Sequence, residues 1–371
     1  MVSPIHSPPA SPLHPPADAA FAVALLNEPA NHAAEMPELH APPAAPAALS
    51  RSPHPLSRAD PNLRNAAGQT ALHRAILAED IAAINVQLRL GADPNLLFGD
   101  DDSPLHWAIR SEAVEVVEAL LAAPKIRIWQ ADENEESPLA LALQNDTPIA
   151  QMLMQHPDFD PLRADARGDT PLMLACRYQR TDIVDSLIVD PRIDINARNN
   201  EGETVLNIAA SVDALEVATL LLQHPQIDLR AVDQYGRTVL LAAVADESIL
   251  VLGMLMADPR CDLTWRDNAG DTAWHLAARA GNSDSINVLC GTAPQLINTQ
   301  DLNGQTALHI AAANGDTEML GVLLAFHEAD PNVHDDQAMT ALFLALLNQQ
   351  TDSVTRLLAD PRTAFGPADS I

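Results

Sequence analysis

Lysine is almost missing from this chain of 371 residues: Lys125 stands alone, and the rest of the 21 Lys and Arg residues are arginines. Cysteine is scarce too, because only Cys176, Cys261 and Cys290 occur, without a Cys-x-x-Cys pair. This odd, scattered set argues against a disulfide framework and favours a reducing compartment. Aromatic residues make up only 3%. A core must therefore be built mainly from Leu, Ala, Val and Ile.

The scarcity of lysine has two interpretations, and the sequence leaves both open. Abundant Ala, Pro, Asp and Arg accompany it, as codon usage in a GC-rich genome would produce. Alternatively, a chain with so little lysine escapes ubiquitin attachment, which requires that side chain. The second interpretation fits a protein that acts inside a eukaryotic host.

Positive charge is in short supply overall, since 50 acidic residues against 21 basic ones give a net charge of −29. Nucleic acid and anionic membranes would repel such a chain, so neither is predicted as a partner. The acids cluster in predicted turns, where they either keep the chain soluble or steer a protein partner with a basic patch. The cluster comprises Asp100, Asp101, Asp102, Asp132, Glu133, Glu135, Glu136, Glu201, Glu203, Asp335 and Asp336.

A short phrase returns nine times at intervals of 33 or 34 residues. It opens with Thr or Ser, which suits a helix N-cap, and Pro often follows, where a helix has no N–H bond to lose. Ala always stands five residues after the opening residue, which indicates a tightly packed helix face. A second apolar run at helical spacing follows, as in Ile183, Val184, Leu187 and Ile188. The opening residues are Thr70, Ser103, Ser137, Thr170, Thr204, Thr238, Thr272, Thr306 and Thr340.

This pattern resembles the ankyrin repeat, whose period is about 33 residues and whose motif reads T-P-L-H-x-A. The resemblance covers roughly residues 60 to 361, and the spaced Trp, Leu-Gly and Tyr pattern of tetratricopeptide repeats is missing. It implies an all-α solenoid of about nine repeats at residues 59–371, each with two helices and a β-hairpin finger. Gly marks six finger tips, whereas Asp101, Glu135 and Ala338 replace it in three, which we expect to be looser or differently shaped.

Residues 1–58 differ from the rest, because Pro, Ala, Ser and His dominate them. This composition predicts a disordered leader. Its apolar stretch at residues 19–26 lacks the basic flank of a secretory signal and is too short to span a membrane. The leader resembles those of bacterial type III effectors. The chain is therefore expected in the cytoplasm, or secreted into a host cell without a cleavable signal peptide, and it has no predicted transmembrane segment.

Catalytic motifs are not found in the sequence: it has no phosphate-binding loop with Lys, no His-Glu-x-x-His and no Gly-x-Ser-x-Gly. His73, His106, His275 and His309 belong to the repeated phrase, and the resemblance implies that each bonds the Thr or Ser at its helix start. We therefore predict no enzyme activity, no cofactor and no metal site.

The resemblance implies binding of a protein partner through the finger tips and the concave ends of the first helices. Tyr, Trp and Arg dominate binding hot spots. The predicted function is a non-enzymatic interaction scaffold, expected to be a monomer and a candidate bacterial effector. The alternative is an adaptor or inhibitor subunit of an enzyme such as a ubiquitin ligase. The predicted partner-binding residues are Arg110, Arg177, Tyr178, Tyr235 and Arg279, followed by Trp129 and Trp265.

Overall fold

The computed structural model describes residues 60–98, 102–145 and 148–364, so the leader predicted at residues 1–58 lies outside the described part. The described residues form pairs of α-helices. The first helices of the pairs are α1 (Ala71–Leu77), α3 (Pro104–Arg110), α5 (Pro138–Gln144), α7 (Pro171–Arg177), α9 (Val205–Ser211), α11 (Val239–Ala245), α13 (Ala273–Ala280), α15 (Ala307–Asn314) and α17 (Ala341–Leu347). The second helices are α2 (Ile81–Arg89), α4 (Val114–Leu121), α6 (Ile149–Met154), α8 (Thr181–Ile188), α10 (Leu215–Gln223), α12 (Ile249–Ala257), α14 (Ser283–Thr292), α16 (Thr317–Ala325) and α18 (Thr351–Leu358). A 3-10 turn, η2 (Pro294–Leu296), follows α14.

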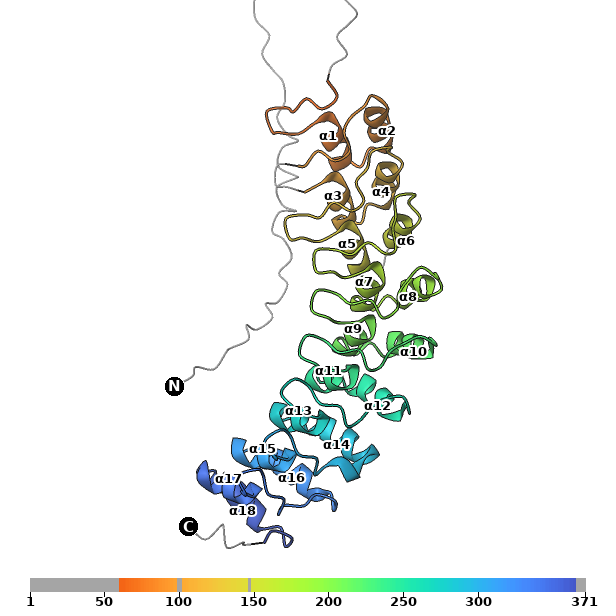
Figure 1. Cartoon of the computed structure of the whole chain (residues 1–371). Helices are drawn as coiled ribbons and strands as arrows, with labels where there is room; N and C mark the ends of the chain where they lie inside the picture. Colours follow the sequence, from red (N-terminus) through yellow and green to blue (C-terminus); the bar gives the residue numbers. More distant parts are fainter. Residues whose placement is uncertain (1–59, 99–101, 146–147, 365–371) are drawn as a thin grey trace, which may run out of the picture. The chain divides into compact units, whose positions relative to one another are not determined.

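The helices lie in two layers. Odd-numbered helices follow one another along the array, and even-numbered helices form a second row beside them (Figure 1). Each helix pair packs on the pairs before and after it. The core is therefore a continuous stack of thin apolar layers, which is how repeat proteins bury surface that one repeat alone would expose.

The predicted helix starts are confirmed, since every first helix begins one residue after its Thr or Ser. The Thr70 hydroxyl accepts the backbone N–H of His73 at 3.1 Å, an N-cap that satisfies one donor of the first turn. Pro104, Pro138 and Pro171 occupy the first helical position, as predicted.

The alanines of the repeated phrase are buried on the packed face of the first helices. Ala75 is 7% exposed, and the eight that follow it in the other repeats are fully buried. A larger side chain there would push neighbouring helices apart. The prediction of a tightly packed face is confirmed.

The fingers are turns, and no strand is found in residues 60–98, 102–145 and 148–364, so the hairpin part of the fold prediction is not seen as β-structure. In the fourth finger, the N–H of Asp165 donates to the carbonyl of Asp169, and the N–H of Gly168 donates to the carbonyl of Asp165, both at 3.0 Å. The Asp165 carboxylate also accepts the N–H groups of Arg167 and Asp169. The side chains that close the other fingers in this way are Asn65, Asp132, Asn199, Asp233, Asp267, Asp301 and Asp335.

The expectation that fingers without a tip glycine differ in shape is wrong where it can be checked. Glu135 and Ala338 adopt φ of 63° and 60°, close to the 78° of Gly168, and both keep the turn hydrogen bond to the carbonyl three residues earlier. The hydrogen bonds that the aspartate side chain accepts from backbone N–H groups hold the turn, so these residues are forced into the left-handed region despite their Cβ. Asp101 lies outside the described residues.

Residues other than glycine also adopt the left-handed conformation in the turn between the two helices of a repeat. One of them is Glu112, with φ of 53°. We expect Glu112→Gly to stabilise the array by about 1 kcal/mol, because a left-handed conformation costs roughly that amount when a Cβ is present. Glu112→Ala keeps the Cβ and serves as the control. Urea unfolding measures both variants, and equal free energies of unfolding would contradict the strain argument.

Candidate functional site

The C-terminal ends of the first helices and the finger tips form a surface, called here the finger surface, that corresponds to the predicted concave face. Arg110, Arg177 and Arg279 lie in the last turns of α3, α7 and α13, and Tyr178 directly follows α7. Tyr235 stands at the tip of the sixth finger and is 55% exposed. Periodic packing brings these residues to one surface, although the repeats that carry them are not all adjacent.

Each of the three arginines forms an ion pair with an acid eight residues earlier. Arg177 Nη2 lies 2.9 Å from Asp169 Oδ2 and 3.9 Å from Glu203, which belongs to the next finger. Arg279 pairs with Asp271 at 3.1 Å. These pairs were missed by the sequence reasoning, although the eight-residue spacing between acid and arginine carried the signal.

Arg110 forms ion pairs with two carboxylates. It contacts Asp102 before its own helix and Asp132 in the next finger. Burial disfavours the charged form of Arg110, but the hydrogen bonds and charges of both carboxylates outweigh this and raise the pKa of Arg110 above its usual value. The guanidinium groups of Arg110 and Arg177 therefore bridge neighbouring repeats while part of each side chain remains accessible.

These pairs make arginine substitutions risky as binding tests. The Asp169 side chain is fully buried, and Arg177 and the Nδ2 amide of Asn199 supply its hydrogen bonds. We expect Arg177→Ala to destabilise the array by roughly 1–3 kcal/mol, because it leaves a buried carboxylate without its counter-charge. Arg177→Ala combined with Asp169→Asn should recover part of this loss in urea unfolding. A loss unaffected by the second change would show that packing, not charge, accounts for it.

Arg177 and Tyr178 also line a small hollow of about 50 Å³ between the third and fourth fingers. Glu135, Asp165 and Arg167 lie around it. The Tyr178 hydroxyl accepts a hydrogen bond from Gln144 Nε2 of the preceding repeat at 3.3 Å. Both signs of charge and one amphipathic ring thus meet here, which suits recognition of a polar protein surface.

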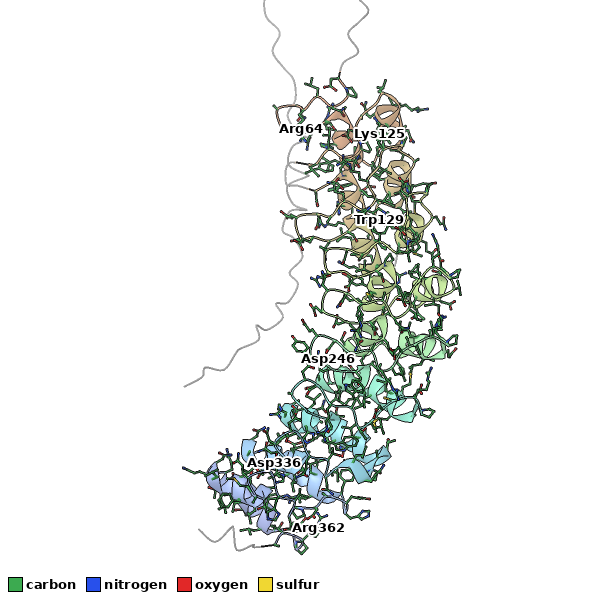
Figure 2. All side chains as sticks on the ribbon, viewed as in Figure 1. Arg64, Lys125, Trp129, Asp246, Asp336 and Arg362 are labelled. Carbon is green, nitrogen blue, oxygen red and sulfur yellow. The ribbon has the colours of Figure 1, made fainter. Side chains whose placement is uncertain are left out.

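The remaining predicted residues are held by local contacts. The guanidinium of Arg237 lies 4.7 Å from the centroid of the Tyr235 ring. Trp265 donates its Nε1–H to the carbonyl of Gly236, on the preceding finger. Trp129, labelled in Figure 2, lies in the connection after α4, stacks on Phe159 with centroids 5.6 Å apart and donates to a backbone carbonyl. Both tryptophans are half-buried, so only part of each ring is open to a partner.

The finger acids divide into two groups that the sequence did not separate. Asp132 and Asp335 are buried and close their turns, so they are not the solvated residues that the sequence suggested. Glu133, Glu201 and Asp336 are exposed. Figure 2 places Asp336 toward the C-terminal end of the array. Only the exposed group can steer a basic partner through its charge.

The cysteines are buried or half-buried, and burial raises the pKa of the Cys290 thiol to about 11 and that of Cys261 to about 12. Neither forms an appreciable thiolate near neutral pH. In the part of the chain that the structure describes, no group of three or more His, Cys, Asp or Glu side chains could hold a metal ion. No helix among the same residues is long and apolar enough to cross a membrane.

Helix pairs stacked in two layers, capped by Thr or Ser and joined through turn-shaped fingers, define a helical repeat solenoid. A family model for ankyrin repeats, described as three copies, matches residues 49–132, 125–199, 207–300 and 274–364. The chain therefore belongs to the ankyrin-repeat family. Such repeats generally mediate protein–protein interaction, and the family is typically non-enzymatic.

Among solved structures, the chain is similar to one described as the crystal structure of EF0377, an ankyrin repeat protein. The two are 24% identical, the match covers 50% of this chain and 96% of that chain, and the TM-score is 0.46.

Proposed function

We propose that this protein is a non-enzymatic scaffold that binds a protein partner on its finger surface. The observation that carries the proposal is the variety of residues at one repeat position, seven residues after the opening Thr or Ser. Among the residues found at this position are Leu77, Arg110, Gln144, Arg177 and Ala245. Packing keeps Ala at the position two residues earlier in every repeat, whereas this position varies, as expected of a surface adapted to one partner.

Charge supplies the second part of the proposal. The exposed finger acids Glu133, Glu201 and Asp336 would attract a partner with a basic patch, while Arg177 and Tyr178 make the central contacts. We further propose that the protein is a monomer and that its repeat domain begins at residue 59, after a separate leader. Its proposed role is that of a secreted bacterial effector. The exposed Lys125 is the one lysine at which ubiquitin attachment inside a host could occur.

Crosslinking mass spectrometry with native or host lysate would identify the partner and the face that it contacts. Recovery of ubiquitin-ligase subunits, or of a single stoichiometric enzyme, would favour an adaptor or inhibitor role. Crosslinks confined to the second helices would place the site elsewhere and overturn the proposed surface.

With the partner in hand, surface plasmon resonance at two ionic strengths tests the division of roles. We expect Tyr178→Ala to speed dissociation and to weaken binding by about 1–3 kcal/mol. Neutralising Glu201 and Asp336 to Gln and Asn should mainly slow association and reduce its salt dependence. Asp335→Asn is the matched control, because Asn65 and Asn199 close the same turn in other fingers. If Tyr178→Ala leaves dissociation unchanged, the central contacts lie elsewhere.

A further inference from the structure

The second-helix layer carries one feature that the repeat pattern does not explain. Six second helices have an acid in the first turn, where it interacts favourably with the helix dipole. These acids are Glu115, Asp182, Glu216, Asp284, Glu318 and Asp352. The sixth repeat has Leu250 at this position, and its side chain is 56% exposed.

The helix that carries Leu250 contains no polar side chain. Its sequence, ILVLGMLMA, covers residues 249–257 of α12, so its outer side is as apolar as its inner side. A helix that is apolar all round is normally buried on all sides. Along the outer side, Leu250 is exposed, Met254 one turn later is half-buried, and Ala257 is exposed. The Thr219 hydroxyl of α10 lies 3.9 Å from Met254 Sδ, whereas Leu250 keeps more than half of its surface open to solvent.

Neighbouring helices widen the apolar stripe. Helices α10 and α14 pack on either side of α12 (Figure 1). Leu220 of α10 and Val288 of α14 are half-buried and occupy the same repeat position as Met254. Nothing lies within 4 Å of the Cβ positions of Gly253 and Gly291, so neither glycine is covered by a neighbouring side chain.

The rim of this surface is acidic. Glu216 on α10, Glu247 in the turn before α12 and Asp284 on α14 are all exposed. Arg260, which follows α12, is paired with Asp258 at 2.6 Å and does not offset them. Two copies of the chain docked through this surface would bring like charges together, which disfavours self-association.

We propose that the outer side of α12, centred on Leu250 and Met254, docks a short amphipathic segment of a partner protein whose apolar side is flanked by arginine or lysine. This surface lies on the second-helix layer and is independent of the finger surface. Apolar contact with Leu250 supplies affinity, and the acidic rim selects basic flanks.

Synthetic helical peptides test the proposal by fluorescence anisotropy with the full chain. The first peptide has leucines at positions i, i+4 and i+7 between arginines. A second has serines in place of the leucines, and a third has glutamates in place of the arginines. We expect only the first to bind, more weakly at high salt.

Leu250→Glu introduces an acid at the position where six other repeats carry one, so we expect the variant to fold. Its added negative charge would by itself strengthen binding of an arginine-rich peptide. A loss of about tenfold or more therefore reports lost apolar contact. Val189→Glu, at the C-terminal end of α8 where the residue is 74% exposed, adds the same charge and should not weaken binding. Tyr178→Ala should also bind normally, which separates this surface from the finger surface.

Four results would overturn the proposal. If the serine peptide binds as tightly as the first peptide, binding reflects only attraction by net charge. If the glutamate peptide binds as tightly, the acidic rim does not select basic flanks. Sedimentation that shows a dimer lost on Leu250→Glu would replace the partner segment by a second copy of the chain. If the Leu250→Glu variant binds the first peptide as tightly as the original chain does, the peptide site lies away from α12.

Discussion

Acidification from pH 7 to pH 5 is expected to destabilise this array steeply. Burial lowers the pKa of His73, His106, His275 and His309 below the usual 6.5. Below pH 6.5 the unfolded chain binds protons that the folded chain excludes, so stability falls as pH falls toward the folded pKa values and is fully present above pH 6.5. The slope approaches about 1.4 kcal/mol per pH unit for each such histidine.

The geometry explains why protonation is unfavourable. The backbone N–H of Thr272 donates to His275 Nδ1 at 3.1 Å, so the ring proton must reside on Nε2, which donates to the carbonyl of Gln305 at 2.8 Å. A second proton on Nδ1 would face an N–H donor in a buried site. The neutral histidine therefore links its own helix start to the next finger.

Urea unfolding at several pH values measures the slope, and a matched variant separates the histidines from the acids. Asn207 occupies the histidine position in the fifth repeat and caps its helix in the same way. Changing the four histidines to Asn should flatten the dependence between pH 5 and 6.5, even if stability falls at every pH. Burial raises the pKa of Asp165, so protonation of this carboxyl at lower pH favours the folded chain and opposes the effect of the histidines. An unchanged slope would show that the histidines are not responsible.

Leu206→Ala should destabilise the array by roughly 2–5 kcal/mol. Leu206 is fully buried in α9, near the middle of the array, and its removal leaves a cavity between repeats that contact only their neighbours. Because both halves of the array depend on this interface, urea unfolding should also become less cooperative. Leu342→Ala, at the same position in the last repeat, is expected to fray that end only.

Hydrogen exchange distinguishes the two variants by where protection is lost. Val189→Ala, on an exposed side chain, controls for a general effect of truncation. A cavity variant whose protection falls only within α9 and α10 would contradict coupling through neighbouring repeats.

The site could be predicted only in part. The sequence indicated which residues reach the finger surface, because their repeat position determines where they lie. The pairing of Arg110, Arg177 and Arg279 with acids was not predicted, although the eight-residue spacing recurs in the sequence. Those pairs depend on side-chain directions and, for Glu203, on a residue contributed by the next repeat.

By itself, the sequence determined the family, the period, the helix starts and the buried alanines, because each of these depends on short-range signals that recur in every repeat. Only the tertiary structure decided the rest. Hydrogen bonds within its finger hold Glu135 in a conformation normally left to glycine. Asp335 is withdrawn from solvent into its own turn, and Leu250 is exposed on an otherwise repetitive surface. These outcomes depend on contacts of individual side chains in three dimensions, which a periodic pattern does not specify.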